Sequence, residues 1–228
     1  MCRPWSWRIG WVSPEATVVE YWNHNSAYHP WIIGIVSGMR APDVLDVGCG
    51  EGLLLQRLAP LSATVTGVEP DPGAAARAGA RLLRTPNASV TTSGFAAFDA
   101  GDRLFDVITF VAALHHMDTR SSLAKAETLL RPGGKLLVVG LAANRTFADW
   151  VLSGIALPWV RLGSMLHRES RDIGVPTAEA TENVAEIRAI AHEELPGARL
   201  RRGLYYRYLL SWTKPTDDVE GAVTAPPR

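Results

Sequence analysis

The chain has 228 residues, of which 47% are hydrophobic and 20% are charged, and its 23 basic side chains balance its 23 acidic ones. This composition is typical of a soluble globular protein with one sizeable core, and a neutral chain has no overall field that would attract nucleic acid or an anionic membrane. The two cysteines, Cys2 and Cys49, are too few for a disulfide framework or a metal cluster.

No segment predicts export or membrane insertion. Residues 1–13 lack the apolar core of a signal peptide. The longest apolar tract, residues 151–160, contains Pro158 and is shorter than the roughly 20 residues that span a bilayer. Together with the sparse cysteines, these features favour a cytoplasmic protein.

The first 41 residues are predicted to form an aromatic segment that ends in a cap helix. A polar aromatic loop leads to a short helix from Pro30, because proline suits the first turn of a helix. The side chains of this loop either close over a binding site or pack on the outside of a sheet, and both alternatives stay open. They are Tyr21, His24, Tyr28 and His29.

From residue 42 onward, strands and helices alternate as they do in a doubly wound α/β domain. Short apolar and β-branched runs predict strands at 43–47, 63–69, 89–92, 104–113 and 135–141. Helical spacing predicts helices at 53–58, 72–83 and 120–130.

The alternation stops after residue 141. An insertion at 146–176 contains an apolar stretch that is hinged at Pro158, and it stands where a lid over a substrate would be placed. A dimer contact or plain core are the alternatives, and we favour a lid that also contributes core. Further predictions are a helix at 179–195, a closing hairpin at 199–213 and a frayed tail at 216–228.

The stretch DVLDVGCGEG, residues 43–52, places Gly48, Gly50 and Gly52 between a strand and a helix. Glycine lets the backbone approach a ligand closely, and the start of a helix offers unpaired N–H groups. This pattern predicts a nucleotide-binding corner, although such turns also occur simply to pack a helix closely on a strand.

The next predicted strand ends in Glu69, whose carboxylate can accept both hydroxyl groups of an adenosine ribose and disfavours a 2′-phosphate. The NAD fingerprint places an acid at a similar distance, but its turn reads Gly-x-Gly-x-x-Gly. Here the bulky Leu53 stands where that fingerprint needs a third small residue. The spacing therefore disfavours NAD and leaves other adenosyl cofactors.

Four motifs occur in order: VLDVGCGEG (44–52), GVEPD (67–71), FDVITFVAALHHM (105–117) and LLRPGGKLLVV (129–139). Together they resemble the class I S-adenosylmethionine-dependent methyltransferases, over residues 21–215. The resemblance implies a Rossmann-like, doubly wound, seven-stranded, mostly parallel sheet with an antiparallel last strand. It implies a catalytic domain at 42–215 that binds S-adenosyl-L-methionine over the carboxyl edge of the sheet.

The flanking segments YWNHNSAYHPW (21–31) and LPGARLRRGLYYRYLLSWTKP (195–215) resemble a small-molecule subgroup that is typical of high-GC bacteria. The 20 arginines against 3 lysines of the whole chain agree with that source. The resemblance implies a small-molecule acceptor, with no nucleic acid and no membrane as partner, and a monomer or homodimer. The methyl group would reach the acceptor by in-line displacement. The alternatives are an NAD-dependent oxidoreductase on a related Rossmann fold and a non-catalytic cofactor-binding partner protein.

The resemblance also implies which residues bind the cofactor: Asp46, Gly48, Cys49, Gly50, Gly52, Glu69, Pro70, Gly94, Phe95, Val111 and Leu114. Asp46 would organise the turn and the cofactor's amino end, and Cys49 would be a small turn residue rather than a nucleophile. Many relatives bond the adenine amino group with an acid after the third strand, but residues 93–95 contain none. Adenine would then lean on Phe95 or use backbone groups.

His115 and His116 follow the fourth strand, at the edge where the acceptor is expected. A neutral imidazole there can act as a base toward a hydroxyl, a phenol or an acidic carbon. Alternatively, the pair caps a helix or contacts the backbone. Asp118 either orients a histidine or forms the N-terminal cap of the next helix.

No metal ligand set is predicted. Four arginines near the end of the chain are predicted to lie on solvated strand faces rather than to form a nucleic-acid track, because no aromatic-interleaved basic groove accompanies them. These are Arg199, Arg201, Arg202 and Arg207.

Overall fold

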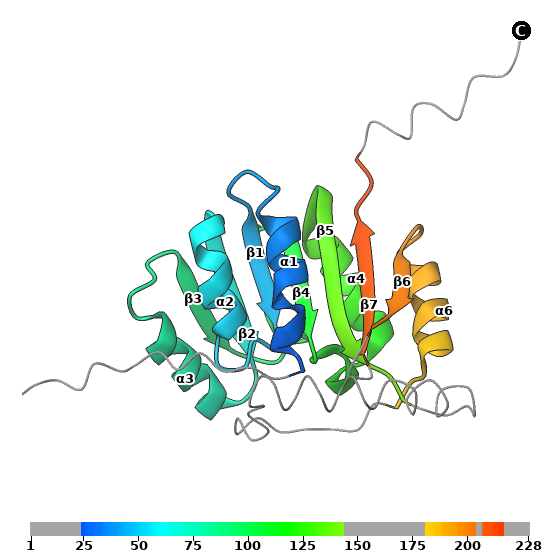
Figure 1. Cartoon of the computed structure of the whole chain (residues 1–228), viewed down its shortest axis with the longest axis horizontal. Helices are drawn as coiled ribbons and strands as arrows, with labels where there is room; N and C mark the ends of the chain where they lie inside the picture. The colour runs from blue at the N-terminus through cyan, green and yellow to red at the C-terminus, as the bar shows by residue number, and fades with distance from the viewer. Residues whose placement is uncertain (1–23, 144–180, 204–206, 217–228) are drawn as a thin grey trace, which may run out of the picture.

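The computed structural model describes residues 24–143, 181–203 and 207–216 (Figure 1). Within these ranges lies one seven-stranded sheet of order β3-β2-β1-β4-β5-β7-β6. Tyr21, the predicted insertion at 146–176 and nearly all of the predicted tail lie outside the described residues.

The strands are arranged as in a doubly wound sheet. The five neighbouring strands β3, β2, β1, β4 and β5 pair in parallel. β7 runs antiparallel to both β5 and β6, so the predicted antiparallel last strand is confirmed. The strand bounds are β1 Asp43–Val47, β2 Thr64–Glu69, β3 Ala88–Thr92, β4 Phe105–Val111, β5 Leu130–Leu141, β6 Arg199–Arg202 and β7 Arg207–Thr213.

Helices cover both faces of the sheet (Figure 1). On one face lie α1 (His29–Val36), α2 (Leu53–Leu58) and α3 (Pro72–Leu82). On the other lie α4 (Thr119–Leu129) and α6 (Val184–Glu194). Single 3-10 turns complete the order: η1 (Ser26–Tyr28), η2 (Ala59–Leu61) and η3 (Leu114–His116).

Side-chain caps explain where three of the helices begin. Asp71 accepts a hydrogen bond from the N–H of Ala74 at the start of α3, and Pro72 follows it in the first turn. Asp118 caps α4 in the same way by accepting from the N–H of Ser121 at 2.8 Å. Asn183 and Glu186 form a capping box at α6. Of the two alternatives for Asp118, the cap is the one observed.

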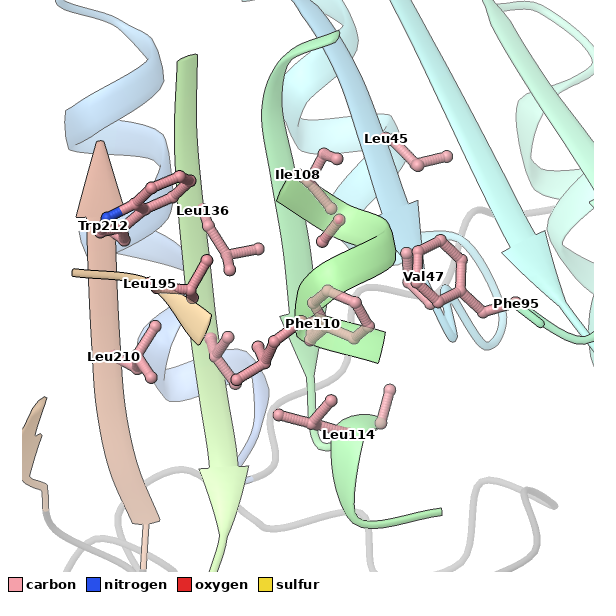
Figure 2. Packing of buried hydrophobic residues seen from close by; sticks show 14 of the residues in the cluster. Leu45, Val47, Phe95, Ile108, Phe110, Leu114, Leu136, Leu195, Leu210 and Trp212 are labelled. Atoms are coloured by element: carbon pink, nitrogen blue, oxygen red, sulfur yellow. The ribbon is translucent and has the colours of Figure 1, made fainter. Parts of the chain in front are cut away.

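The larger core cluster fills the space between the sheet and the pair α4 and α6 (Figure 2). The indole of Trp212 in this cluster is 4% exposed and donates its N–H to the carbonyl of Pro196 at 2.9 Å, which satisfies the polar atom of an otherwise apolar residue. Tyr208 lies across Gly140 of the neighbouring strand, where a Cβ would come within 2.2 Å of its ring. The close pairing of β5 with β7 therefore requires a glycine at this position.

One strand begins earlier than predicted. β5 starts at Leu130 rather than at Lys135, and its register against β4 shifts between Phe105 and Val107. The glycines at the irregularity exchange backbone hydrogen bonds with Lys214, from Gly133 N–H to the Lys214 carbonyl and from Lys214 N–H to the Gly134 carbonyl, both at 2.9 Å. The Pro-Gly-Gly stretch at 132–134 is thus held in the sheet by a partner far along the chain.

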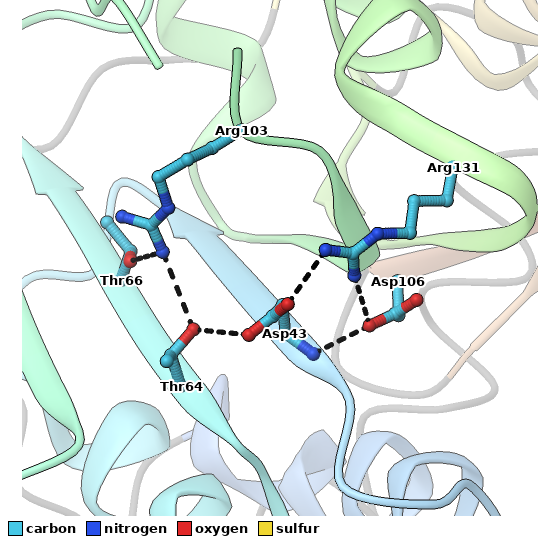
Figure 3. Close-up of polar contacts among 6 residues, drawn as sticks. All are labelled: Asp43, Thr64, Thr66, Arg103, Asp106 and Arg131. Carbon is cyan, nitrogen blue, oxygen red and sulfur yellow. Dashed lines mark hydrogen bonds and ion pairs between the residues drawn. The ribbon is translucent and has the colours of Figure 1, made fainter. Parts of the chain in front are cut away.

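A polar network joins the amino ends of β1, β2 and β4, at the opposite edge of the sheet from the glycine turn (Figure 3). Arg131 donates to Asp106 at 2.6 Å and to Asp43 at 2.9 Å. Thr64 donates to the other carboxylate oxygen of Asp43 at 2.7 Å. The Thr64 hydrogen bond, followed by Arg131, holds the pKa of Asp43 below its ordinary value.

We expect Arg131→Met to lower the free energy of unfolding by about 1 kcal/mol at pH 7, because partly exposed ion pairs contribute little each. A carboxyl whose pKa is depressed in the folded state stabilises the protein above its unfolded pKa, about 3.9, and loses that contribution as the pH falls through the folded pKa. The difference from the wild type should therefore shrink by pH 3. Urea denaturation at both pH values measures it, with Lys135→Met on β5 as the control. An undiminished difference at pH 3 would contradict this role of the network.

Candidate functional site

The glycine turn, residues 48–52, connects β1 to α2 at the carboxyl edge of the sheet. Gly48, Gly50 and Gly52 have φ values of 70°, 53° and 75°, a region that favours glycine. A Cβ at Gly48 would lie 2.5 Å from the Cβ of Ala113, whereas no heavy atom lies within 4 Å of the Cβ position of Gly50. The turn is therefore tightly packed at Gly48 and open at Gly50.

Glu69, the last residue of β2, binds this turn through its side chain. It is 4% exposed, and its Oε2 accepts a hydrogen bond from the N–H of Gly50 at 2.9 Å. Its Oε1 accepts from the N–H of Asp71 at 3.0 Å. A carboxylate oxygen has two lone pairs, so each oxygen can accept one further hydrogen bond. The two backbone donors thus fix a pair of acceptor oxygens beside the open side of the turn.

A second carboxyl group lies beneath the turn. Asp46 of β1 is 2% exposed and accepts a hydrogen bond from the hydroxyl of Thr109 on β4 at 2.6 Å. Burial raises the pKa of Asp46 to about 7, the Thr109 hydrogen bond acts in the opposite direction, and the charge of Glu69 raises it further. The ionisation of Asp46 is therefore sensitive to any charge that is placed on the turn.

Cys49 faces the sheet. A Cβ at Gly67 of β2 would lie 2.6 Å from the Cys49 sulfur, so the thiol fits only because that position is a glycine. Burial, together with the charges of Asp46 and Glu69, raises the pKa of the thiol. Since the nucleophile is the thiolate, this environment favours the prediction of a small turn residue over a nucleophile.

The loop after β3 forms the neighbouring wall. The backbone N–H of Ser93 donates to the carbonyl of Glu69 at 3.1 Å, which joins the loop to the end of β2. Gly94 is exposed, with no heavy atom within 4 Å of its Cβ position. Asp99, the first acid after this strand, accepts from the N–H of Gly101 at 2.8 Å within a turn. The backbone at Gly94 is therefore open to a ligand.

Phe95 belongs to the core rather than to the open side of this loop. Its ring is 3% exposed and meets the ring of Phe110 edge-on at 5.4 Å (Figure 2). Lys125 of α4 donates to the carbonyls of Phe95, Ala96 and Phe98 at 2.8, 3.0 and 2.6 Å, and so fastens the loop from below. Of the two alternatives for adenine, this arrangement favours backbone groups over the Phe95 ring.

The chain turns sharply after β4. Ala112 has a φ of 53°, which is uncommon for a residue with a Cβ, and its N–H donates to the carbonyl of Val139 at 2.7 Å. The η3 turn follows, with Leu114 fully buried in the core, His115 partly buried and His116 exposed. The two imidazole centroids are 4.1 Å apart. The structure thus places both histidines at the carboxyl edge, as expected.

Two further predicted contacts differ in their exposure. Val111, at the end of β4, is partly buried against the cluster on the α1 face. Pro70, directly after Glu69, is exposed. Because the Leu114 side chain is fully buried, only its backbone is available to a ligand.

The predicted site residues of the loop before β1 have different environments. His29 is buried, and its Nδ1 lies 3.0 Å from a guanidinium nitrogen of Arg57 on α2. Burial, with the charge of Arg57, lowers the pKa of His29 to about 3 and keeps the ring neutral. This favours packing between α1 and α2 over a role in a site. His24 is partly buried, and the Tyr28 hydroxyl lies against Gly203, before β7.

The prediction for the four arginines is wrong at one position. Arg199, Arg201 and Arg202 of β6 are exposed, but Arg207 is only partly so. Arg207 donates from Nε and Nη2 to the side-chain oxygen of Asn25, at 3.2 and 2.5 Å. The segment before α1 covers this end of β7, a contact between distant parts of the chain that no local pattern indicates.

Three contributors to the site were missed. Asp71 could have been found, because Asp before Pro is a signal for the start of a helix. Thr109 stands in register with Asp46 on the adjacent strand, and Lys125 reaches the loop from another helix. Neither of these two has a signal in its own neighbourhood.

Two absences hold for the described ranges. No group of three or more His, Cys, Asp or Glu side chains there could hold a metal ion. None of the helices that the structure describes is both long and apolar enough to cross a membrane.

Comparison with known proteins gives consistent matches. A family profile described as a methyltransferase domain matches residues 45–136. A Mycobacterium tuberculosis protein named as an uncharacterized methyltransferase is 34% identical over 205 residues, covering 85% of this chain and 98% of that one. A ubiquinone biosynthesis O-methyltransferase of Idiomarina loihiensis is 28% identical and covers 90% of this chain and 88% of its own length.

Solved structures show the same fold. An N-methyltransferase of Bradyrhizobium japonicum in complex with S-adenosyl-L-homocysteine has a TM-score of 0.58 at 19% identity, covering 85% of this chain and 89% of that one. An amino pentose methyltransferase of Micromonospora echinaspora with bound S-adenosylmethionine has a TM-score of 0.59 at 18% identity, covering 84% and 92%.

We expect Asp46→Asn to remove a pH dependence of stability. A carboxyl whose folded pKa is about 7, against about 3.9 unfolded, stabilises the fold below pH 4 and loses that contribution as the pH rises to 7. Relative to the wild type, the neutral variant should gain on the order of 3 kcal/mol of stability between pH 5 and pH 8. Denaturation of both proteins at pH 5 and pH 8 measures the gain, and a pH-independent difference would show that Asp46 is not the titrating group.

Proposed function

We propose that this chain, which belongs to the class I S-adenosylmethionine-dependent methyltransferases, transfers the methyl group of its cofactor to a small organic acceptor in the cytoplasm. The names of two relatives support a small acceptor, since one methylates in ubiquinone biosynthesis and the other is an amino pentose methyltransferase. The balanced charge of the chain supports the same proposal, because nothing overall attracts a nucleic acid.

The observation that carries this proposal is the arrangement of Glu69. Its two oxygens, each fixed by one backbone N–H, stand beside the open position at Gly50. We assign the ribose hydroxyl groups to these oxygens. The residues therefore fit an adenosyl cofactor, because a hydroxyl donor can meet each oxygen without breaking the bonds to Gly50 and Asp71.

The other cofactor contacts follow from exposure. Backbone groups of Gly48, Cys49, Gly50 and Gly52 would line the cofactor, and Asp46 would favour its ammonium end from beneath the turn. We assign adenine to the backbone at Gly94. Pro70 and Val111 would contact the cofactor at the margins of its site, and Leu114 would contact it only through its backbone.

The sulfonium methyl group that the cofactor supplies is already electrophilic, so the main task of the chain is to orient the acceptor. Holding two reactants in line can lower a barrier by several kcal/mol. A base is needed in addition where the acceptor is a hydroxyl, a phenol or an acidic carbon. We assign that role to His116, which is exposed at the carboxyl edge, and to His115 beside it.

The two alternatives from the sequence are set aside. The relatives named above are methyltransferases, and two of the solved structures hold S-adenosylmethionine or its product. This family excludes the NAD-dependent oxidoreductase and disfavours a protein that only binds the cofactor.

We expect Glu69→Ala to weaken the binding of S-adenosyl-L-homocysteine by tenfold or more, because hydrogen bonds to a charged group contribute about 1.5–3 kcal/mol each. Calorimetric titration measures the dissociation constant. Glu51→Ala is the matched control, since Glu51 lies in the same turn but pairs with Arg77 at 2.6 Å. Equal dissociation constants for the wild type and Glu69→Ala would remove Glu69 from the cofactor site.

We expect His116→Ala to lower kcat for a phenolic acceptor by about a hundredfold, the lower end of what general bases contribute. The rates of the variant and the wild type are compared from pH 6 to pH 8. His115→Ala, tested in parallel, shows whether the partly buried ring shares this role. Full turnover by both variants over this pH range would exclude proton abstraction by the pair.

A further inference from the structure

Arg207, at the start of β7, is an arginine whose charge no acid of the described residues balances. Four other arginines of the described ranges, Arg77, Arg81, Arg120 and Arg131, each form ion pairs with Glu or Asp. No carboxylate in the described ranges pairs with Arg207. Its hydrogen bonds go to the neutral side-chain amide of Asn25. Buried charges are normally paired, so this guanidinium lacks an expected partner.

Among the described residues, the groups that act on Arg207 are polar, and none of them is an acid. The Tyr28 oxygen is the electrostatic neighbour that favours its charged form, while burial lowers the pKa of Arg207 to about 10. The guanidinium thus remains a cation at neutral pH, held by an amide and flanked by a phenol. Its Nε and Nη2 atoms are occupied by Asn25, and Nη1 makes no hydrogen bond with any described residue.

The position of Arg207 relates it to the reaction. Arg207 is the first residue of β7 and stands in register with Leu141, the last residue of β5, which places it at the carboxyl edge of the sheet. β5 in turn neighbours β4, which leads into the turn that carries His115 and His116. Because the next residue, Tyr208, is buried in the cluster on the α4 face, strand alternation directs Arg207 to the α1 face, where Tyr28 lies. Along the carboxyl edge, β4 and β5 therefore lie between the glycine turn and Arg207. Arg207 is thus on the side of β4 where the acceptor is expected.

The chemistry of a guanidinium selects the ligand. Its planar fork matches a carboxylate or a phosphate, and such pairs are the strongest hydrogen bonds that arginine makes. We propose that Arg207, oriented by Asn25 and flanked by Tyr28, binds an oxyanion carried by the methyl acceptor. This inference rests on the proposed function, and it narrows the small organic acceptor to an anionic one. The carboxylate of the cofactor is the other possible source of the same chemistry.

The test uses the whole chain and begins with the cofactor product. S-adenosyl-L-homocysteine is titrated into the wild type, Arg207→Gln and the control Arg201→Gln, which alters an exposed arginine of the neighbouring strand. Glutamine can still donate to Asn25 but carries no charge. We expect the three dissociation constants to agree within twofold, because Arg207 serves the acceptor and not the cofactor.

The second step titrates each protein, saturated with S-adenosyl-L-homocysteine, with benzoate and with its neutral analogue benzamide at constant ionic strength. We expect the wild type and Arg201→Gln to bind benzoate at least tenfold more tightly than benzamide, and Arg207→Gln to lose this preference. Asn25→Asp is the second variant, and it supplies an acid partner without altering Arg207. It should fold with unchanged or increased stability and also lose the preference.

Three outcomes overturn the proposal. One is the absence of a charge preference in the wild type, and another is a preference that survives in Arg207→Gln or Asn25→Asp. The third is a tenfold loss of affinity for S-adenosyl-L-homocysteine in Arg207→Gln, which would assign Arg207 to the carboxylate of the cofactor. A wild type that does not bind S-adenosyl-L-homocysteine at all would instead contradict the cofactor assignment, so the two failures are distinct.

Discussion

The carboxylate of Glu69, bound by the backbone N–H groups of Gly50 and Asp71, is the interaction on which the site depends. It joins the glycine turn after β1 to the end of β2, in addition to the bonds that the N–H groups of Gly48 and Cys49 donate to the carbonyl of Val68. The parallel register of β1 and β2 brings the strand ends together, and the positive φ values of the turn expose its backbone. Binding geometry here is thus a consequence of sheet pairing rather than of a flexible loop.

The electrostatics of the carboxyl edge are divided between two ends. Asp46 and Glu69 place two carboxyl groups near one another, and no basic side chain in the described part of the chain forms an ion pair with either. That environment suits a cofactor with an ammonium and a sulfonium group. Beyond β4, Arg207 offers a cation that pairs with no acid in the part of the chain that the structure describes. The cofactor, with its positive groups, would therefore bind near Asp46 and Glu69, and an anionic acceptor would bind near Arg207.

Most of the fold could be predicted because its signals are local. The strand 43–47 and the helix 53–58 have the predicted bounds, and Glu69 ends its strand as expected. What could not be predicted depends on distant partners: the early start of β5 needs Lys214, the buried hydrogen bond of Asp46 needs Thr109, and the burial of Arg207 needs Asn25. Phe95 shows the same limit. Its position in the sequence is compatible with a ring that contacts adenine, but Phe110 and Lys125 place this ring in the core.

A crystal structure of the chain with S-adenosyl-L-homocysteine tests the central claim most directly. The account predicts both ribose hydroxyl groups within hydrogen-bond distance of the Glu69 oxygens, with the Gly50 and Asp71 bonds to that carboxylate preserved. A nucleoside bound elsewhere, or a Glu69 side chain turned away from the ribose, would contradict it.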